Sequence, residues 1–211
     1  MIGNKLEQSI IEVFQNDLSS TFSINQISKI LKKSYPIINQ KCNFLLDEGV
    51  LRKINIGRSY QCSLNVTNEK ARILMSVNEL NKRDEFIQKN KHVEGIIDEI
   101  SQLSKKFEIE TVILSKKNIL IVMNGNEDKD FSSRKKDLLE IRSLTKDHIL
   151  AFYDLDSFKN KFLTDIELQK YHIVLSNTDL YINMVATAVD ELITRKILDV
   201  KQNNTDARDT E

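Results

Sequence analysis

The N-terminal fold is decided by one stretch, Ser34-Tyr-Pro-Ile-Ile-Asn-Gln-Lys-Cys-Asn-Phe-Leu-Leu-Asp-Glu-Gly-Val-Leu51. Ser34 is expected to cap a helix, and Pro36 falls in its first turn, where a missing N–H loses no hydrogen bond. Gly49 can adopt the left-handed conformation that ends a helix. Apolar residues recur at helical spacing and predict one buried side: Ile38, Cys42 and Leu45.

The opposite side of this predicted helix is polar. It carries Tyr35, Asn39, Gln40 and Asn43. Asn and Gln side chains can form two hydrogen bonds to an adenine edge in the major groove of DNA. The start of the helix also favours a nearby phosphate. This face is therefore a candidate for reading base sequence.

Helices and strands are predicted on both sides of this stretch. An amphipathic helix is expected over 5–16, a short strand at Thr21–Phe22, and a helix from Ser23, where Gln26 completes a capping box. Two strands, 50–56 and 59–65, should follow and turn at Gly57–Arg58. We expect one compact unit over residues 1–66.

Positive charge is concentrated in this unit, although the whole chain has no net charge. Between Leu18 and Asn68 there are two acids, Asp47 and Glu48, against seven basic residues. The basic residues are Lys29, Lys32, Lys33, Lys41, Arg52, Lys53 and Arg58. A local basic surface on a helix–turn–helix with a hairpin is typical of a DNA-binding protein.

Residues 5–65 resemble winged-helix regulators of the MarR/ArsR type, on the quoted helix and on the hairpin Asn55-Ile-Gly-Arg-Ser-Tyr. The resemblance implies that the third helix enters the major groove of double-stranded DNA. Lys32, Lys33 and Lys41 would then contact the phosphate backbone, and Arg58 would reach from the hairpin. The implied DNA-binding residues are Lys32, Lys33, Ser34, Tyr35, Asn39, Gln40, Lys41, Asn43 and Arg58.

Two other interpretations of this unit stay open. Winged helices also serve as protein-interaction modules, so the chain could be an antitoxin-like or scaffold protein that uses the unit for docking. Basic faces are also often simply solvated. A salt-titrated binding assay separates DNA binding from docking, because phosphate contacts impose a steep salt dependence.

Residues 67–91 are predicted to form a linker helix. Ile73, Val77, Leu80 and Ile87 follow a spacing of four, three and seven, with Asp84 in the skipped position. This short seam could pair with a second copy of the chain, or it could pack on its own domain. A homodimer is expected, since helix-turn-helix proteins usually read two half-sites.

Residues 92–200 are predicted to form a small α/β domain, with the order helix–strand–strand–helix–strand–helix–strand–helix. This order is similar to minimal nucleotidyltransferase domains, which archaeal regulators fuse behind a winged helix. Three segments carry the similarity: Glu110-Thr-Val-Ile-Leu, Asp154-Leu-Asp-Ser-Phe-Lys-Asn-Lys-Phe and Leu168-Gln-Lys-Tyr-His-Ile-Val-Leu-Ser.

The residues that such an enzyme needs are missing. The chain contains no Gly-Ser dipeptide to hold a triphosphate, and only Ser115-Lys-Lys-Asn stands where the loop and the acidic metal-binding pair should lie. We therefore expect a catalytically inactive domain that serves dimerisation or contact with a partner or ligand. The rival is a divergent enzyme that uses Asp128 and Asp130.

The remaining features favour a cytoplasmic α+β transcription regulator without a cofactor or metal. No apolar run is long enough to span a bilayer, so no membrane association is expected. Cys42 and Cys62 should be reduced core thiols. The three histidines (His92, His148 and His172) lack metal-ligand spacing. Residues 201–211 should be a disordered tail, because residues 202–211 contain almost no apolar side chains.

Overall fold

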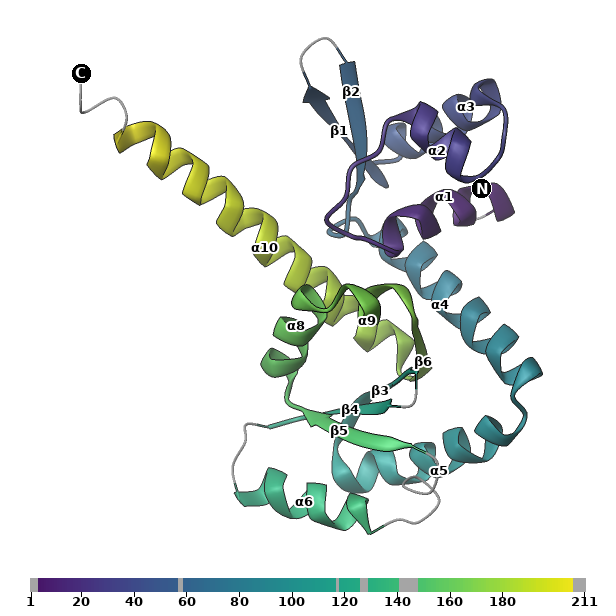
Figure 1. The fold of residues 1–211 in the computed structure, drawn as a ribbon, viewed down its shortest axis with the longest axis vertical. Coiled ribbons are helices and arrows are strands. Elements are labelled where there is room, and N and C mark those ends of the chain that lie inside the picture. Colours follow the sequence, from purple (N-terminus) through teal and green to yellow (C-terminus); the bar gives the residue numbers. More distant parts are fainter. Residues whose placement is uncertain (1–3, 57–58, 117, 126–128, 141–147, 207–211) are drawn as a thin grey trace.

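The computed structural model describes residues 4–206 except 57–58, 117, 126–128 and 141–147. It is an α+β protein, as expected, and the described strands form a two-stranded and a four-stranded sheet. Figure 1 shows the first part of the chain at the top, the four-stranded sheet below it and one helix, α4, running between them. We call residues 4–66 the N-terminal unit and residues 92–206 the C-terminal unit.

Three helices build the N-terminal unit: α1 (Lys5–Gln15), α2 (Ile24–Ile30) and α3 (Tyr35–Asp47). The Asn4 side chain caps α1, and the Ser23 side chain caps α2 by accepting from the N–H of Gln26. The capping box expected at Ser23 is confirmed. Ser34 does precede α3, but its side chain makes no capping hydrogen bond.

A hairpin completes this unit. Strands β1 (Leu51–Ile56) and β2 (Ser59–Leu64) pair antiparallel. Where a short strand was predicted at Thr21–Phe22, Phe22 alone forms an isolated bridge, exchanging two backbone hydrogen bonds with Cys62. The Phe22 ring meets the Phe14 ring edge-on, with centroids 5.4 Å apart. Ile38, Cys42 and Leu45 are fully buried, which confirms the predicted apolar side of α3.

Helix α4 (Glu69–Lys89) begins at Asn68, whose side chain accepts from the N–H of Ala71. It contacts α1 in the N-terminal unit and β6 and α10 in the C-terminal unit. Leu74 and Met75 are buried in these contacts, whereas Ile73 is 55% exposed on another side. The helix is therefore a structural element shared by both units and more than a linker.

The C-terminal unit follows the predicted order of strands and helices. Its sheet has the order β5-β4-β3-β6, with β5 parallel to β4 and the other pairs antiparallel. The elements are α5 (His92–Phe107), β3 (Ile109–Ser115), β4 (Asn118–Met123), α6 (Lys129–Leu139), β5 (Ile149–Tyr153), α8 (Leu155–Thr164), α9 (Ile166–Lys170), β6 (His172–Ser176) and α10 (Thr178–Asp206).

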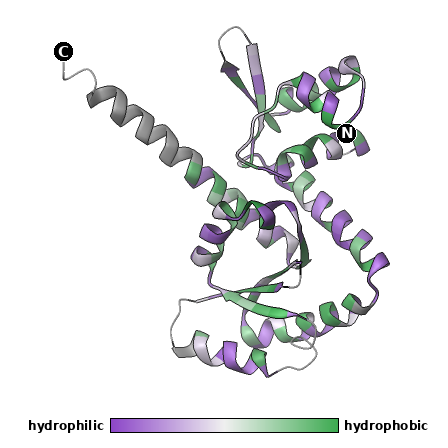
Figure 2. Cartoon of the chain, in the orientation of Figure 1, coloured by the Kyte–Doolittle hydropathy of each residue, from purple (hydrophilic) through white to green (hydrophobic). Residues whose placement is uncertain are grey.

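Helices cover both faces of this sheet, so its central strands are almost continuously apolar (Figure 2). On β4, Ile119 and Ile121 face α5 and α6, while Leu120 and Val122 face the other core. That second core is continuous with the core of the N-terminal unit: it joins Phe14 of α1 and Met75 of α4 to Phe158 of α8. The predicted boundaries at 66 and 92 therefore do not separate two independent cores.

Three details differ from the sequence-based expectations. The short helix α9 was not predicted. The sequence predicts a charged helix near 132–143, whereas α6 spans Lys129–Leu139. Helix α10 continues to Asp206, into the segment 201–211 that was expected to be disordered, because an existing helix gains one hydrogen bond for each residue it adds. Within the described residues, none of the helices combines the length and apolarity that a bilayer crossing requires.

Two glycines allow a matched test of the end of α3. Gly49 has a φ of +70°, and a Cβ there would lie 3.2 Å from Asn68 Nδ2, whereas a Cβ on Gly95 of α5 would meet nothing within 4 Å. We expect Gly49→Ala to lower the free energy of unfolding by about 1–2 kcal/mol, and Gly95→Ala to raise it by about 0.5–1 kcal/mol. Urea denaturation measures both, and effects of the same sign would contradict this account.

Candidate nucleic-acid interface

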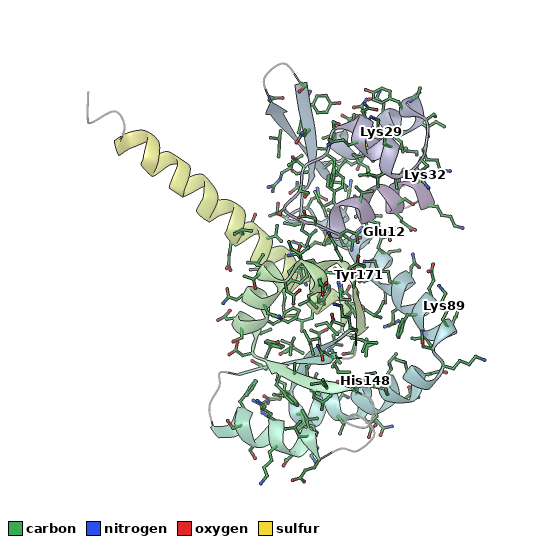
Figure 3. All side chains as sticks on the ribbon, in the orientation of Figure 1. Glu12, Lys29, Lys32, Lys89, His148 and Tyr171 are labelled. Atoms are coloured by element: carbon green, nitrogen blue, oxygen red, sulfur yellow. The ribbon has the colours of Figure 1, made fainter. Side chains whose placement is uncertain are left out.

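Exposed cations gather at the turn between α2 and α3. Lys29, Lys32 and Lys33 are all exposed, and no ion pair within the described part of the chain involves them. Figure 3 places Lys29 and Lys32 at the end of the molecule that lies far from the four-stranded sheet. The turn is therefore a region of unneutralised positive charge.

Lys32 has an unusual backbone conformation. Its φ is +51°, in the left-handed region, directly after α2 ends. Glycine takes this conformation without steric cost, whereas other residues lose about 1–2 kcal/mol in it. The neighbouring Lys33 N–H donates to Ser28 O at 3.0 Å and fixes the turn. A long cationic side chain thus stands where the backbone would prefer glycine, which favours a role for its charge.

The start of α3 lies next to these lysines. Because the Ser34 side chain makes no capping hydrogen bond, it does not satisfy the N–H groups of the first turn. Free helix N–H groups beside Lys32 and Lys33 form a favourable setting for a phosphate oxygen. Tyr35 is 50% exposed immediately after this point.

The predicted base-reading residues do not all have the same exposure. Tyr35, Gln40 and Asn43 are exposed, whereas Asn39 is half-buried. Asn43 also borders an open groove between α3 and the hairpin. This groove is lined by Asn43, Leu46, Asp47, Leu51, Lys53 and Tyr60.

Lys53 and Tyr60 were not predicted as site residues. The Lys53 ammonium lies 4.1 Å from the centroid of the Tyr60 ring. Lys53 pairs with Cys62, two residues from Tyr60, so the two side chains are diagonal neighbours on one face of the hairpin. The strand alternation contained this signal, but only the register of the two strands brings the residues together.

Lys41 lies in a different environment from the other predicted cations. Its Nζ donates to Glu7 Oε1 at 3.0 Å, and the Glu7 side chain is only 1% exposed. Glu7 also accepts from the Asn4 side chain at 2.9 Å. Lys41 therefore joins α3 to α1 and is held away from the exposed set. Arg58, which was predicted to reach DNA from the hairpin, lies outside the described residues.

The two cysteines lie behind this surface, in the core. Cys42 of α3 and Cys62 of β2 are free and fully buried. Burial raises the pKa of the Cys42 thiol to about 12, with a smaller contribution from nearby Cys62, and burial raises the pKa of Cys62 to about 11. Both thiols are therefore protonated and unreactive near neutral pH, in agreement with their interpretation as reduced core residues.

The expected position of a nucleotide site in the C-terminal unit is a tight turn. Ser115 of β3 pairs directly with Asn118 of β4, which leaves two residues, 116 and 117, between the strands. Among the described residues, no three His, Cys, Asp or Glu side chains gather to hold a metal ion. Asp128 and the side chain of Asp130, the alternative acids, lie outside the described part of the chain.

The structural role of Lys41 can be tested directly. Lys41→Met keeps the aliphatic stem but removes the ammonium group that pairs with the buried Glu7 carboxylate, so we expect a loss of about 1–3 kcal/mol in unfolding free energy. Lys33→Met, at an exposed site, should change it by less than about 0.5 kcal/mol. Thermal or urea denaturation of both variants gives the comparison, and equal stabilities would contradict the assignment of Lys41.

Comparison of the chain with protein-family models, with curated proteins and with solved structures found no match. The geometry of this surface is therefore the basis for the proposed function. Its main features are the exposed lysines of the α2–α3 turn, the uncapped start of α3, the exposed amides of α3 and the groove beside the hairpin.

Proposed function

We propose that this chain is a winged-helix DNA-binding protein that regulates transcription and inserts α3 into the major groove of double-stranded DNA. The order α1, short strand at Phe22, α2, α3 and hairpin supports a winged-helix arrangement. The observation that carries the proposal is Lys32, a cation kept in a left-handed turn beside the uncapped start of α3.

The proposed contacts divide by chemistry. Lys29, Lys32 and Lys33 bind phosphates and supply affinity that does not depend on base sequence. Gln40 and Asn43 face base edges, since exposed amides can recognise adenine. Lys53 adds a cation from the hairpin side of the groove. The total charge of the chain is zero, so this binding depends on where the cations lie.

We further propose that the C-terminal unit is a nucleotidyltransferase-like domain without transferase activity. The two-residue β3–β4 connection offers no room for a phosphate-binding loop followed by a helix. The unit would instead serve dimerisation or contact with a partner or ligand. Buried free thiols fit a reducing compartment, so we place the protein in the cytoplasm.

A protein-docking role is the second candidate, and one observation favours it. Ile30, Tyr35 and Ile37 are large apolar side chains that are each about half exposed near the α2–α3 turn. Exposed apolar side chains are typical of protein contacts. Docking through them would depend little on salt, whereas DNA binding weakens steeply as salt rises.

Lys32→Gly separates DNA binding from folding. It relieves the left-handed strain at position 32, so the free energy of unfolding should stay equal or rise by up to about 1 kcal/mol. Affinity for a fluorescently labelled duplex should fall, and the slope of log K against log salt should decrease by about 0.9 for the phosphate contact that is lost. Lys89→Gly, at the far end of α4 (Figure 3), controls for the loss of one positive charge.

Gln40→Ala tests the proposed orientation of α3 on DNA, measured by fluorescence anisotropy with the same labelled duplex. We expect the slope of log K against log salt to stay unchanged, because Gln40 contacts a base and not a phosphate. The binding free energy should weaken by about 1–3 kcal/mol, and only on the preferred DNA sequence. If the wild-type protein binds no duplex at low salt, DNA binding is wrong and the docking candidate remains.

We also propose a homodimer that forms through the outer side of α4. Ile73 is 55% exposed there, and Val77, Leu80 and Ile87 of the same seam are half-buried. Sedimentation velocity should detect a dimer at micromolar concentration, and Ile73→Asp should shift it toward monomer, because a charge placed within an apolar helix seam is poorly solvated. A wild-type monomer at all concentrations would contradict this assembly.

A further inference from the structure

A buried polar cluster lies where the two units meet. We call it the junction network. Its residues come from α1, α4, β6 and α10: Gln15, Asn78, Glu79, Lys82, His172 and Tyr181. The side chains of Glu79 and His172 are only 1% and 3% exposed. Polar groups buried so deeply are stable only when partners compensate them.

Glu79 is the centre of the network. Its Oε1 accepts from Gln15 Nε2 at 3.1 Å and from Lys82 Nζ at 3.0 Å. Its Oε2 has no aligned hydrogen-bond donor in the described part of the chain and lies 3.2 Å from His172 Nε2, an ion-pair contact. The two oxygens of this carboxylate therefore depend on different units: Oε1 on α1 and α4, and Oε2 on β6.

Both ring nitrogens of His172 have polar neighbours. Nδ1 lies 2.8 Å from Leu168 O and 3.1 Å from Gln169 O, and carbonyl oxygens only accept, so Nδ1 carries a proton. Nε2 lies 2.8 Å from the Tyr181 hydroxyl and faces the Glu79 carboxylate. Burial first, and the Glu79 charge second, raise the pKa of Tyr181 well above its ordinary value, so its hydroxyl stays neutral.

Helix α1 connects this network to α3. Gln15, the last residue of α1, also accepts from Asn78 Nδ2 at 2.6 Å and donates to Met75 O at 3.3 Å, so the end of α1 is fixed on α4. About two helical turns earlier, Glu7 of α1 holds Lys41 of α3. One rigid helix thus makes a buried polar contact at each end, one toward the C-terminal unit and one toward α3.

We propose that the junction network and α1 couple the C-terminal unit to α3, so that a shift of β6 at His172 changes the stability and position of α3. The path runs from His172 to Glu79, from Glu79 to Gln15, along α1 to Glu7, and from Glu7 to Lys41. The coupling itself is independent of DNA. Only its effect on a bound duplex rests on the proposed function.

Hydrogen exchange of the full chain, measured without DNA, tests the coupling. His172→Phe removes both ring hydrogen-bonding nitrogens, and Glu79→Gln removes the charge while keeping the shape. Each change removes a hydrogen bond or ion-pair contact of a buried charged group, so we expect the amides of α3 to exchange about tenfold faster or more in both variants. Tyr171→Phe, at an exposed neighbour of His172, should leave α3 unchanged.

A second control separates coupling from general destabilisation. Val174→Ala removes apolar contacts from the same strand, β6, without touching the network. The proposal is overturned if Val174→Ala and His172→Phe lower the global stability equally and also accelerate exchange in α3 equally. It is also overturned if His172→Phe accelerates exchange only in the C-terminal unit. Tyr181→Phe removes only the hydroxyl group and is the smallest of these changes. We expect it to accelerate exchange in α3 less than His172→Phe does. An exchange rate in α3 equal to that of the wild type would contradict the proposed path.

The pH dependence of stability tests whether the ionised Glu79 holds the junction. Burial alone would raise the pKa of Glu79, but contacts with His172 and Lys82 outweigh it and lower the pKa below its ordinary 4.5. A lowered pKa stabilises the fold above pH 4.5, and this stabilisation is lost as the pH falls through the folded-state pKa. The stability gap between wild type and Glu79→Gln should therefore shrink toward pH 3. A constant gap from pH 7 to pH 3 would contradict the role of the charge.

Discussion

The buried carboxylate of Glu79 is the constraint on which the arrangement of the two units depends. An ionised group in an apolar interior requires partners, and here they come from α1, α4 and β6. The apolar core that surrounds it is continuous from Phe14 to Phe158. The polar contacts are directional, so they restrict the orientation more narrowly than the apolar contacts do.

The cations of the N-terminal unit show how position decides what a charge does. Lys41 lies within a few residues of Lys32 and Lys33 in the chain, yet it neutralises the buried Glu7, whereas the other two face solvent. Arg52 donates to Thr67 Oγ1 at 2.6 Å, a contact with a neutral group that leaves its charge in place. The basic window of the sequence is thus divided between internal support and an exposed surface, and only the exposed part is free to attract a polyanion.

The C-terminal unit uses its sheet as a support. Both faces are covered by helices, and its longest strands meet in a two-residue turn. Such a sheet offers a rigid base for β6, which carries His172 into the junction. A unit of this kind is suited to hold or shift the N-terminal unit, and this agrees with the regulatory role that we propose for it.

The sequence alone determined most elements of the fold, because the signals for them act over a few residues. Ser23 and Gln26 mark the start of α2, Gly49 marks the end of α3, and alternation locates β1 and β2. The exposed lysines and amides of the candidate site were also predictable, since helical periodicity separates them from Ile38 and Leu45.

Which polar residues form pairs in the interior depends on the tertiary structure. The Glu7–Lys41 pair joins residues 34 positions apart, and Glu79 meets His172 from the other unit. No local pattern distinguishes these four residues from solvated charges. The same holds for the shared core, because α4 packs on both units only once they are folded against it. Burial and long-range pairing are properties of the assembled chain, and the sequence specifies them only through the complete fold.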